Sequence, residues 1–217
     1  MTVYREKFQQ ELDALIGECI KLGEECHKRL AGTVEVLLAD DIEDARKVVR
    51  NDAEINKMEA DVYAHAINLI TTQQPVATDL RTIISCIKIA DNLERIGDNI
   101  SNVAEVRKRI KITNERTLLR FKTMERLASL MLEDVYTAFK KSDLDLLDEI
   151  ILRDQDIDAV FVQITTSDIF EESDAFLTGQ IQLTAKYLER IGDHIKSIAE
   201  HIYYIHTGDP YEKYKSE

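Results

Sequence analysis

Residues 93–105 read LERIGDNISNVAE, and residues 188–200 read LERIGDHIKSIAE. The two stretches share nine of their thirteen residues and lie 95 positions apart. Within the first, Leu93, Ile96 and Ile100 follow one another at intervals of three and four residues, and the second repeats these intervals. Apolar residues at this spacing form the buried face of an amphipathic α-helix. The repeat therefore predicts two similar halves, each with a long helix of the same kind.

The rest of the chain has the same helical periodicity and few residues that would interrupt it. Seven Gly and two Pro among 217 residues are too few turn signals for a sheet protein of this length, which excludes an all-β fold. Turn and cap signals stand at Gly32, Pro75, Thr113 or Asn114, Ser142, and Ser173 with Asp174. They predict six helices, with Ser142 capping the fifth. The expected fold is all-α, with two tandem three-helix bundles at 1–111 and 113–207 and a tail at 208–217.

The charge and the cysteines restrict the class of protein. With 28 basic and 41 acidic residues, the net charge is −13, which repels a phosphate backbone, so nucleic acid is not expected as a partner. Three cysteines without a Cys-x-x-Cys motif predict reduced core thiols. No apolar run is long enough for a signal peptide or a membrane span. We therefore expect a cytoplasmic protein that is peripheral to the membrane at most.

A glycine interrupts the apolar face at the same place in both repeats. Gly97 and Gly192 border the apolar seam, although a glycine within a helix costs about 1 kcal/mol relative to alanine. Because both halves carry it, we expect each glycine to allow close approach of a neighbouring helix.

The opposite face of each repeat helix carries carboxylates. Asp91, Glu94 and Asp98 form an acidic stripe in the first half, and Glu189 and Asp193 occupy matching positions in the second. Such a stripe is usually a solvated surface. Like charges four residues apart, however, destabilise a helix by about 0.2–0.5 kcal/mol unless something neutralises them. Repetition of the pair in both halves therefore favours a function for it.

The hairpins bring further carboxylates to these stripes. Asp52 lies as far before Pro75 as Asp98 lies after it, so an antiparallel hairpin places the two side by side. In the second half, the same reasoning places Asp154 beside Asp193 and Asp158 beside Glu189. All-oxygen sites favour Mg, Mn, Ca, Fe or, less well, Zn. The sequence thus predicts metal sites on two clusters, made of Asp52, Asp91, Glu94 and Asp98 in the first half and Asp154, Asp158, Glu189 and Asp193 in the second.

These motifs together resemble the PhoU family of phosphate-uptake regulators over essentially the whole chain. The resemblance is carried by YREKF at 4–8, QPVATDLR at 74–81, LERIGD at 93–98, YLERIGDH at 187–194 and the Thr-Gly at 207–208. Their order, spacing and duplication make it specific.

The resemblance implies two three-helix bundles, often dimeric, with multinuclear clusters of Fe or Zn on the paired carboxylates. It also implies a negative regulator of phosphate uptake that is not an enzyme. Its partners would be the phosphate-specific ABC transporter and a sensor histidine kinase, at the cytoplasmic face of the membrane. Asn56 and Ser197 depart from the family pattern. Because Asn56 removes a carboxylate from the first cluster, we expect the second site to bind metal more tightly.

Two other readings remain open at this stage. A metal-carboxylate enzyme or metal store of the di-iron type needs Glu-x-x-His pairs from two helices, and only Glu24 with His27 offers one. A helical adaptor without metal is the other alternative. It predicts unchanged partner binding when Glu189 becomes Gln and Asp193 becomes Asn.

Arg95 and His194 lie near the clusters in the sequence, but a functional role is the less favoured interpretation of each. Arg95 stands three residues before Asp98 and is expected to form an ion pair within the helix. His194 follows Asp193 but points about 100° away from it on a helix, which disfavours a ligand role.

Overall fold

The structure is a computed structural model that describes residues 2–39, 41–167 and 174–211. The described residues form helices and their connections, without strands, and the all-α prediction is confirmed. The helices are α1 (Thr2–Leu30), α2 (Thr33–Leu38), α3 (Ile42–Gln73), α4 (Ala77–Arg109), α5 (Glu115–Lys141), α6 (Leu144–Thr166) and α7 (Ala175–Thr207). The short α2 was not among the six predicted helices, because six residues are too few to show a helical period.

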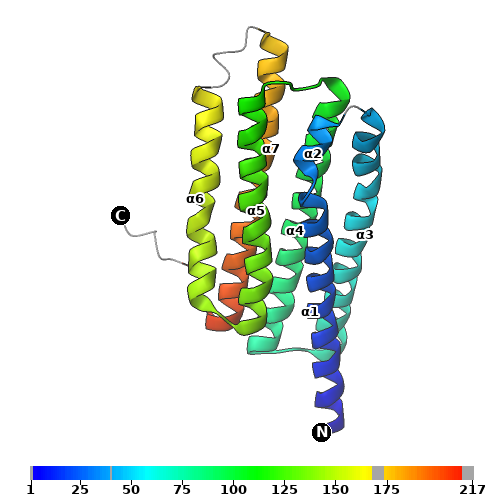
Figure 1. Cartoon of the computed structure of the whole chain (residues 1–217). Helices are drawn as coiled ribbons and strands as arrows, with labels where there is room; N and C mark the ends of the chain where they lie inside the picture. Colours follow the sequence, from blue (N-terminus) through cyan, green and yellow to red (C-terminus); the bar gives the residue numbers. More distant parts are fainter. Residues whose placement is uncertain (1, 40, 168–173, 212–217) are drawn as a thin grey trace.

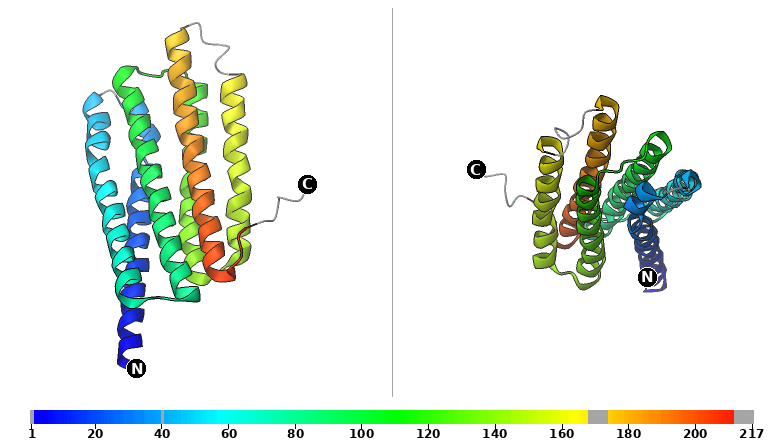
Figure 2. Two further views of the ribbon diagram at one scale, coloured as in Figure 1. Left: turned by 180° about the vertical axis from the view of Figure 1, so that it is seen from behind. Right: turned by 45° about the horizontal axis from the view of Figure 1, so that its top comes forward.

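The long helices lie in two layers. Helices α3, α4, α7 and α6 stand side by side in that order (Figure 2), and contacts join each to the next. Helices α1 and α5 cover the other side of this layer (Figure 1). Helix α1 packs on α3 and α4, and α5 packs on α6 and α7. The repeat helices α4 and α7 thus lie at the centre and join the two halves.

Side-chain caps explain where several helices begin. Asp41 accepts a hydrogen bond from Glu43 N, Asn114 from Thr117 N, and Asp174 from Phe176 N and Leu177 N. Asp40 and Ser173, at two of these boundaries, lie outside the described residues.

One predicted cap was wrong by a residue. Asp143, not Ser142, caps α6, because its side chain accepts from Leu146 N. Ser142 instead ends α5 in the left-handed conformation, with its N–H donated to the carbonyls of the last turn.

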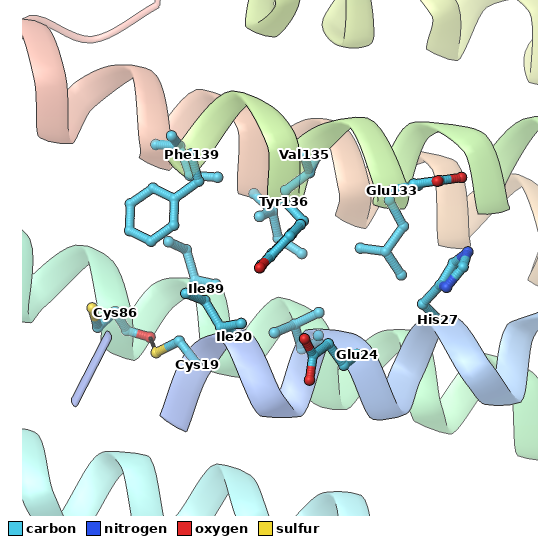
Figure 3. A pocket seen from close by; sticks show the side chains of 15 residues that line it. Cys19, Ile20, Glu24, His27, Cys86, Ile89, Glu133, Val135, Tyr136 and Phe139 are labelled. Carbon is cyan, nitrogen blue, oxygen red and sulfur yellow. Dashed lines mark hydrogen bonds between the residues drawn. The ribbon is translucent and has the colours of Figure 1, made fainter. Parts of the chain in front are cut away.

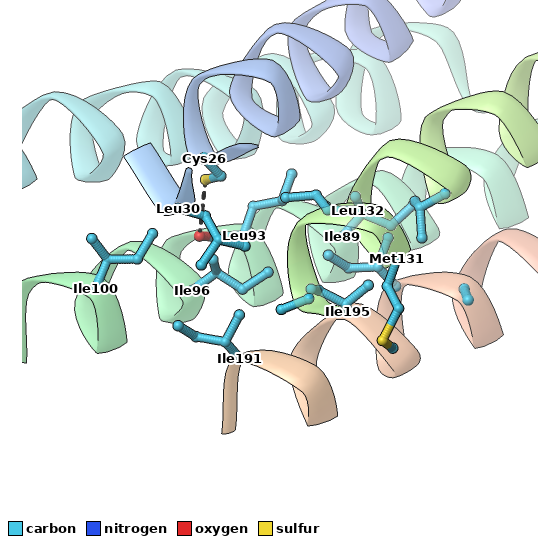
Figure 4. Close-up of a cluster of buried hydrophobic side chains, with 14 of the residues drawn as sticks. Cys26, Leu30, Ile89, Leu93, Ile96, Ile100, Met131, Leu132, Ile191 and Ile195 are labelled. Carbon is cyan, nitrogen blue, oxygen red and sulfur yellow. Dashed lines mark hydrogen bonds between the residues drawn. The ribbon is translucent and has the colours of Figure 1, made fainter. Parts of the chain in front are cut away.

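The apolar faces of α4 and α7 meet in the core that the repeat predicted. Ile96, Ile100, Ile191 and Ile195 are all at most 2% exposed, and they pack with side chains from α1 and α5 (Figure 4). The three cysteines are buried free thiols, as expected. Among the described helices, none is both long enough and apolar enough to cross a bilayer.

Both repeat glycines allow the close approach that the sequence predicted. A Cβ added to Gly97 would lie 2.9 Å from Ile55 Cγ2 of α3. A Cβ added to Gly192 would lie 2.8 Å from Asp154 Oδ1 and 2.9 Å from Ile157 Cδ1 of α6. These contacts are too short for any side chain, so the two glycines set the distances between α3 and α4 and between α6 and α7.

Candidate functional site: two carboxylate clusters

The first cluster joins α3 and α4 at the level that the hairpin geometry predicted. Burial raises the pKa of Asp98, and the negative charge of Asp52 on α3 raises it further. Asp52 accepts a hydrogen bond of 2.9 Å from the Ser101 hydroxyl of α4. The two carboxylates are therefore neighbours across the hairpin.

Glu94 lies between other acidic side chains in the same cluster. Burial is the main cause that raises its pKa, followed by the charge of Asp98 one turn away. Asp91 on α4 and Glu59 on α3 also raise the pKa of Glu94. The sequence analysis missed Glu59, although it lies as far before Pro75 as Asp91 lies after it.

The second cluster has a buried carboxylate at its centre. Asp154 of α6 is 1% exposed, and its Oδ2 accepts a hydrogen bond of 3.1 Å from Lys196 Nζ of α7. Its Oδ1 is buried and has no hydrogen-bond donor among the described residues. Burial raises the pKa of Asp154 to about 6, with further contributions from the charges of Asp193 and Asp158. These three predicted residues therefore lie close together.

Glu189, the fourth predicted residue of this cluster, is held by a lysine. Lys186 Nζ lies 2.6 Å from its Oε1 and 2.5 Å from its Oε2. In the repeat, Lys186 stands where the first half has Asp91, and Lys196 stands where it has Ser101. The second cluster thus contains two ammonium groups at positions that carry no cation in the first.

The structure tests how well the clusters fit a metal ion. Among the described residues, no three His, Cys, Asp or Glu side chains converge tightly enough to form a ready coordination shell. The unpartnered Oδ1 of Asp154 and the mutual repulsion of Glu94, Asp98 and Asp52 are nevertheless features that a cation would satisfy. The donor set, carboxylate oxygens only, suits hard or borderline cations. Metal binding by these eight residues therefore remains a prediction, and their oxygen donors are compatible with it.

Between the two clusters, His194 of α7 contacts α4. His194 Nδ1 lies 3.0 Å from Asn92 Oδ1 of α4, so its ring is turned toward the helix contact. Burial lowers the pKa of His194, and the positive charge of Arg95 lowers it further, whereas the negative charges of Asp193 and Asp91 raise it.

The ion pair predicted for Arg95 has a different partner from the expected one. Arg95 Nε lies 3.3 Å from Asp91 Oδ2, one turn earlier, rather than beside Asp98. A carboxylate four residues before the cation is the more favourable arrangement on a helix, and Asp98 faces Asp52 instead.

The comparisons with known proteins agree with this architecture. The family model described as PhoU domain matches residues 20–106 and 121–202, one match in each half. A phosphate-specific transport system accessory protein PhoU homolog of Clostridium acetobutylicum is 30% identical over 210 residues, which cover 94% of this chain and 96% of that protein. A homolog of this name, numbered 1, from Methanothermobacter thermautotrophicus is 31% identical over 207 residues, covering 92% and 94%.

Solved structures show the same fold. PhoU from Pseudomonas aeruginosa superposes with a TM-score of 0.85 at 28% identity and covers 93% of this chain and all of that one. The phosphate transport system regulatory protein PhoU from Streptococcus pneumoniae gives a TM-score of 0.86 at 24% identity, covering 94% and 99%. With its duplicated LERIGD helices at the centre of the fold and a family match in each half, this chain belongs to the PhoU family.

Proposed function

We propose that the protein is an accessory regulator of phosphate-specific transport that lowers phosphate uptake when phosphate is sufficient. The observation that carries the proposal is the match to curated relatives over nearly the whole of both chains, each relative being named a phosphate-specific transport system accessory protein. A regulator of this kind acts through contacts with other proteins and needs no catalytic residues. We place it at the cytoplasmic face of the membrane, as a homodimer, with phosphate transporter subunits and a sensor histidine kinase as its partners.

The metal-binding part of the proposal rests on the carboxylates. Asp52, Asp91, Glu94 and Asp98 would hold metal in the first cluster, with Glu59 added by the structure. Asp154, Asp158, Glu189 and Asp193 would hold it in the second. A bound ion, Fe or Zn by family resemblance and Mg, Mn or Ca as alternatives, would neutralise these carboxylates and offer open coordination positions to a partner's acidic groups. The raised pKa values of Glu94, Asp98 and Asp154 support this, because burial and neighbouring carboxylates disfavour the charged form of each, and a bound cation would favour it.

The order of affinity is open to a direct test. The sequence predicts tighter metal binding at the second cluster, because Asn56 replaces a carboxylate in the first. In the structure, however, a metal entering the second cluster displaces the ammonium groups of Lys186 and Lys196 from their carboxylates. Calorimetric titration of Zn or Mn into chelator-treated protein, with Glu94→Gln and Glu189→Gln variants, assigns each binding step to a cluster. The absence of any binding step would refute the metal proposal.

Affinity capture tests the proposed partners. The tagged protein is recovered after crosslinking from gently solubilised cells grown with excess phosphate, and the proteins that accompany it are identified. We expect transporter subunits or a sensor kinase. The double variant Glu189→Gln and Asp193→Asn should recover less of them, whereas Glu6→Gln, at an exposed position of α1, should recover as much as the unchanged protein. Equal capture by the double variant would favour the adaptor without metal, and capture of neither partner would contradict the proposal.

A further inference from the structure

A long apolar groove runs between α1 and α5 on the side of the molecule opposite the carboxylates. Its upper part is a cavity of about 140 Å³ (Figure 3), and its lining includes Ile89 of α4 and Ile198 of α7. It continues as an open groove of about 660 Å³ toward the end of the molecule where α4 begins and α7 ends. The two parts share Ile20, Tyr136 and Phe139.

The groove exists because α1 and α5 are joined at one end only. Near that end the Glu125 carboxylate of α5 accepts hydrogen bonds from Gly32 N at 2.8 Å and Val34 N at 3.2 Å. The N-terminal turns of α1 extend past the connection between α3 and α4 (Figure 1). Tyr136 remains 40% exposed in the gap. Beneath the gap, Ile89, Leu93 and Ile198 of the central layer are at most 6% exposed, so a ligand would reach them through the cavity.

The dimensions suit one additional helix. From Gln9 to His27, the groove follows α1 for about 27 Å at 1.5 Å per residue, which is about five helical turns. An apolar cavity of about 150 Å³ accepts a group the size of benzene, so the upper cavity can hold one Phe or Leu side chain. An amphipathic helix that lays its apolar face in such a groove is a common mode of peptide recognition.

Gly23 supports the presence of a ligand at the cavity. It lines the wall of the cavity in the middle of α1, where a glycine costs about 1 kcal/mol relative to alanine. Unlike Gly97, it is not needed for helix packing, because an added Cβ would be 3.9 Å from Leu93, an ordinary contact. Leu93 also lines the cavity, so a longer side chain at position 23 would occupy part of this space.

Charge indicates the kind of helix. Glu24 of α1 and Glu133 of α5 line one end of the cavity together with His27 (Figure 3), and neither carboxylate has an ion-pair partner in the described part of the chain. The other end of the groove has both Asp79 and Lys140. In a protein of net charge −13, this acidic end attracts cations and repels the carboxylate or phosphate head of a lipid.

We propose that this groove binds an amphipathic helix of a partner protein, with a bulky apolar anchor in the cavity and Lys or Arg side chains beside Glu24 and Glu133. The inference rests neither on the metal clusters nor on the role in phosphate transport. A negative result would therefore leave the proposed function intact. It adds a second contact surface, on the side of α4 and α7 away from the carboxylates.

The test uses a fluorescein-labelled synthetic helix of about 18 residues with Leu and Phe along one face and Lys on the other. A matched peptide carries Glu in place of every Lys. Fluorescence anisotropy with the full-length protein should show about tenfold tighter binding of the basic peptide, and added salt should weaken it. Equal affinity for the two peptides would overturn the proposal. Displacement of either peptide by lauric acid would also overturn it, because the groove would then bind a lipid chain.

Variants locate the binding site. Gly23→Met fills the cavity and should weaken binding about tenfold. Gly17→Met is the matched control on the same helix, because a Cβ there meets nothing within 4 Å, and it should leave binding unchanged. If Gly23→Met does not fold by circular dichroism, the surface double variant Glu24→Gln and Glu133→Gln provides the test, with an expected loss of several-fold. Unchanged binding in the folded Gly23→Met protein, or in the Glu double variant, would contradict the proposal.

Discussion

Asp154 determines the electrostatic balance of the second cluster. It is buried, one of its oxygens is unpartnered, and its pKa is raised to about 6 from an ordinary value of 3.8. The folded protein therefore holds this proton more tightly than the unfolded chain does. Raising the pH from about 4 to about 6 ionises the unfolded chain first, and over this interval the metal-free protein loses stability.

Asp154→Asn removes this titration. A shift of about two pKa units corresponds to about 3 kcal/mol at most. We expect the free energy of unfolding of the variant, relative to the unchanged protein, to increase by about 1–3 kcal/mol between pH 4.5 and pH 7.5. Urea unfolding in the presence of a chelator measures the difference. The same difference at both pH values would show that Asp154 ionises normally in the folded state.

Lys196 compensates Asp154 in the absence of metal, so its removal should destabilise the metal-free protein more than the metal-bound protein. In Lys196→Met, the metal-free protein should melt several degrees lower, because the Asp154 carboxylate loses its partner. The increase in melting temperature on adding Zn or Mn should become larger, since no ammonium group then competes with the ion. Lys21→Met, at an exposed position of α1, is the control and should change neither value. An unchanged response to metal would remove Asp154 from the ligand set.

The candidate site could be predicted from the sequence only as far as backbone geometry determines it. Asp52 and Asp98 were placed together correctly, because positions equidistant from Pro75 meet in any antiparallel hairpin. The lysines were not predicted as partners, since the position of a long flexible side chain depends on packing rather than on spacing. The different partner of Arg95 has the same cause.

At the scale of helices, the glycines determine how closely the hairpins pack. Gly97→Ala and Gly192→Ala each gain helix propensity but place a methyl group within 2.9 Å of a neighbouring side chain. We expect both to lower the free energy of unfolding by about 1–3 kcal/mol. Gly17→Ala, with open space around its Cβ, should raise it by about 0.5–1 kcal/mol. Chemical denaturation of the three variants measures this, and stabilisation by Gly97→Ala would show that α3 can move away without cost.

The helices themselves could largely be predicted, because long apolar periods and side-chain caps are local signals. All six long helices were predicted correctly, and the structure assigns two caps to residues that the sequence offered, Asn114 beside Thr113 and Asp174 beside Ser173. The short α2 was missed, because its N-terminal N–H groups are capped by Glu125 from α5, a contact that is distant in the sequence.

At the scale of the whole molecule, the central helices separate two surfaces. On α4, the side chains that line the groove, such as Cys86 and Ile89, lie across the helix from Asp91 and Asp98. The same separation holds on α7 between Ile198 and Asp193. The two proposed contact surfaces therefore do not overlap.

The most direct test of the central claim is the rate of labelled phosphate uptake in cells grown with excess phosphate. Deletion of the gene should raise the rate, and the unchanged protein should restore the low rate. The variant with Glu94→Gln, Asp98→Asn, Glu189→Gln and Asp193→Asn should fail to restore it although it is folded, as shown by circular dichroism of the purified protein. Uptake that is unchanged by the deletion would contradict the account, and full restoration by the fourfold variant would show that the carboxylate clusters are not needed for regulation.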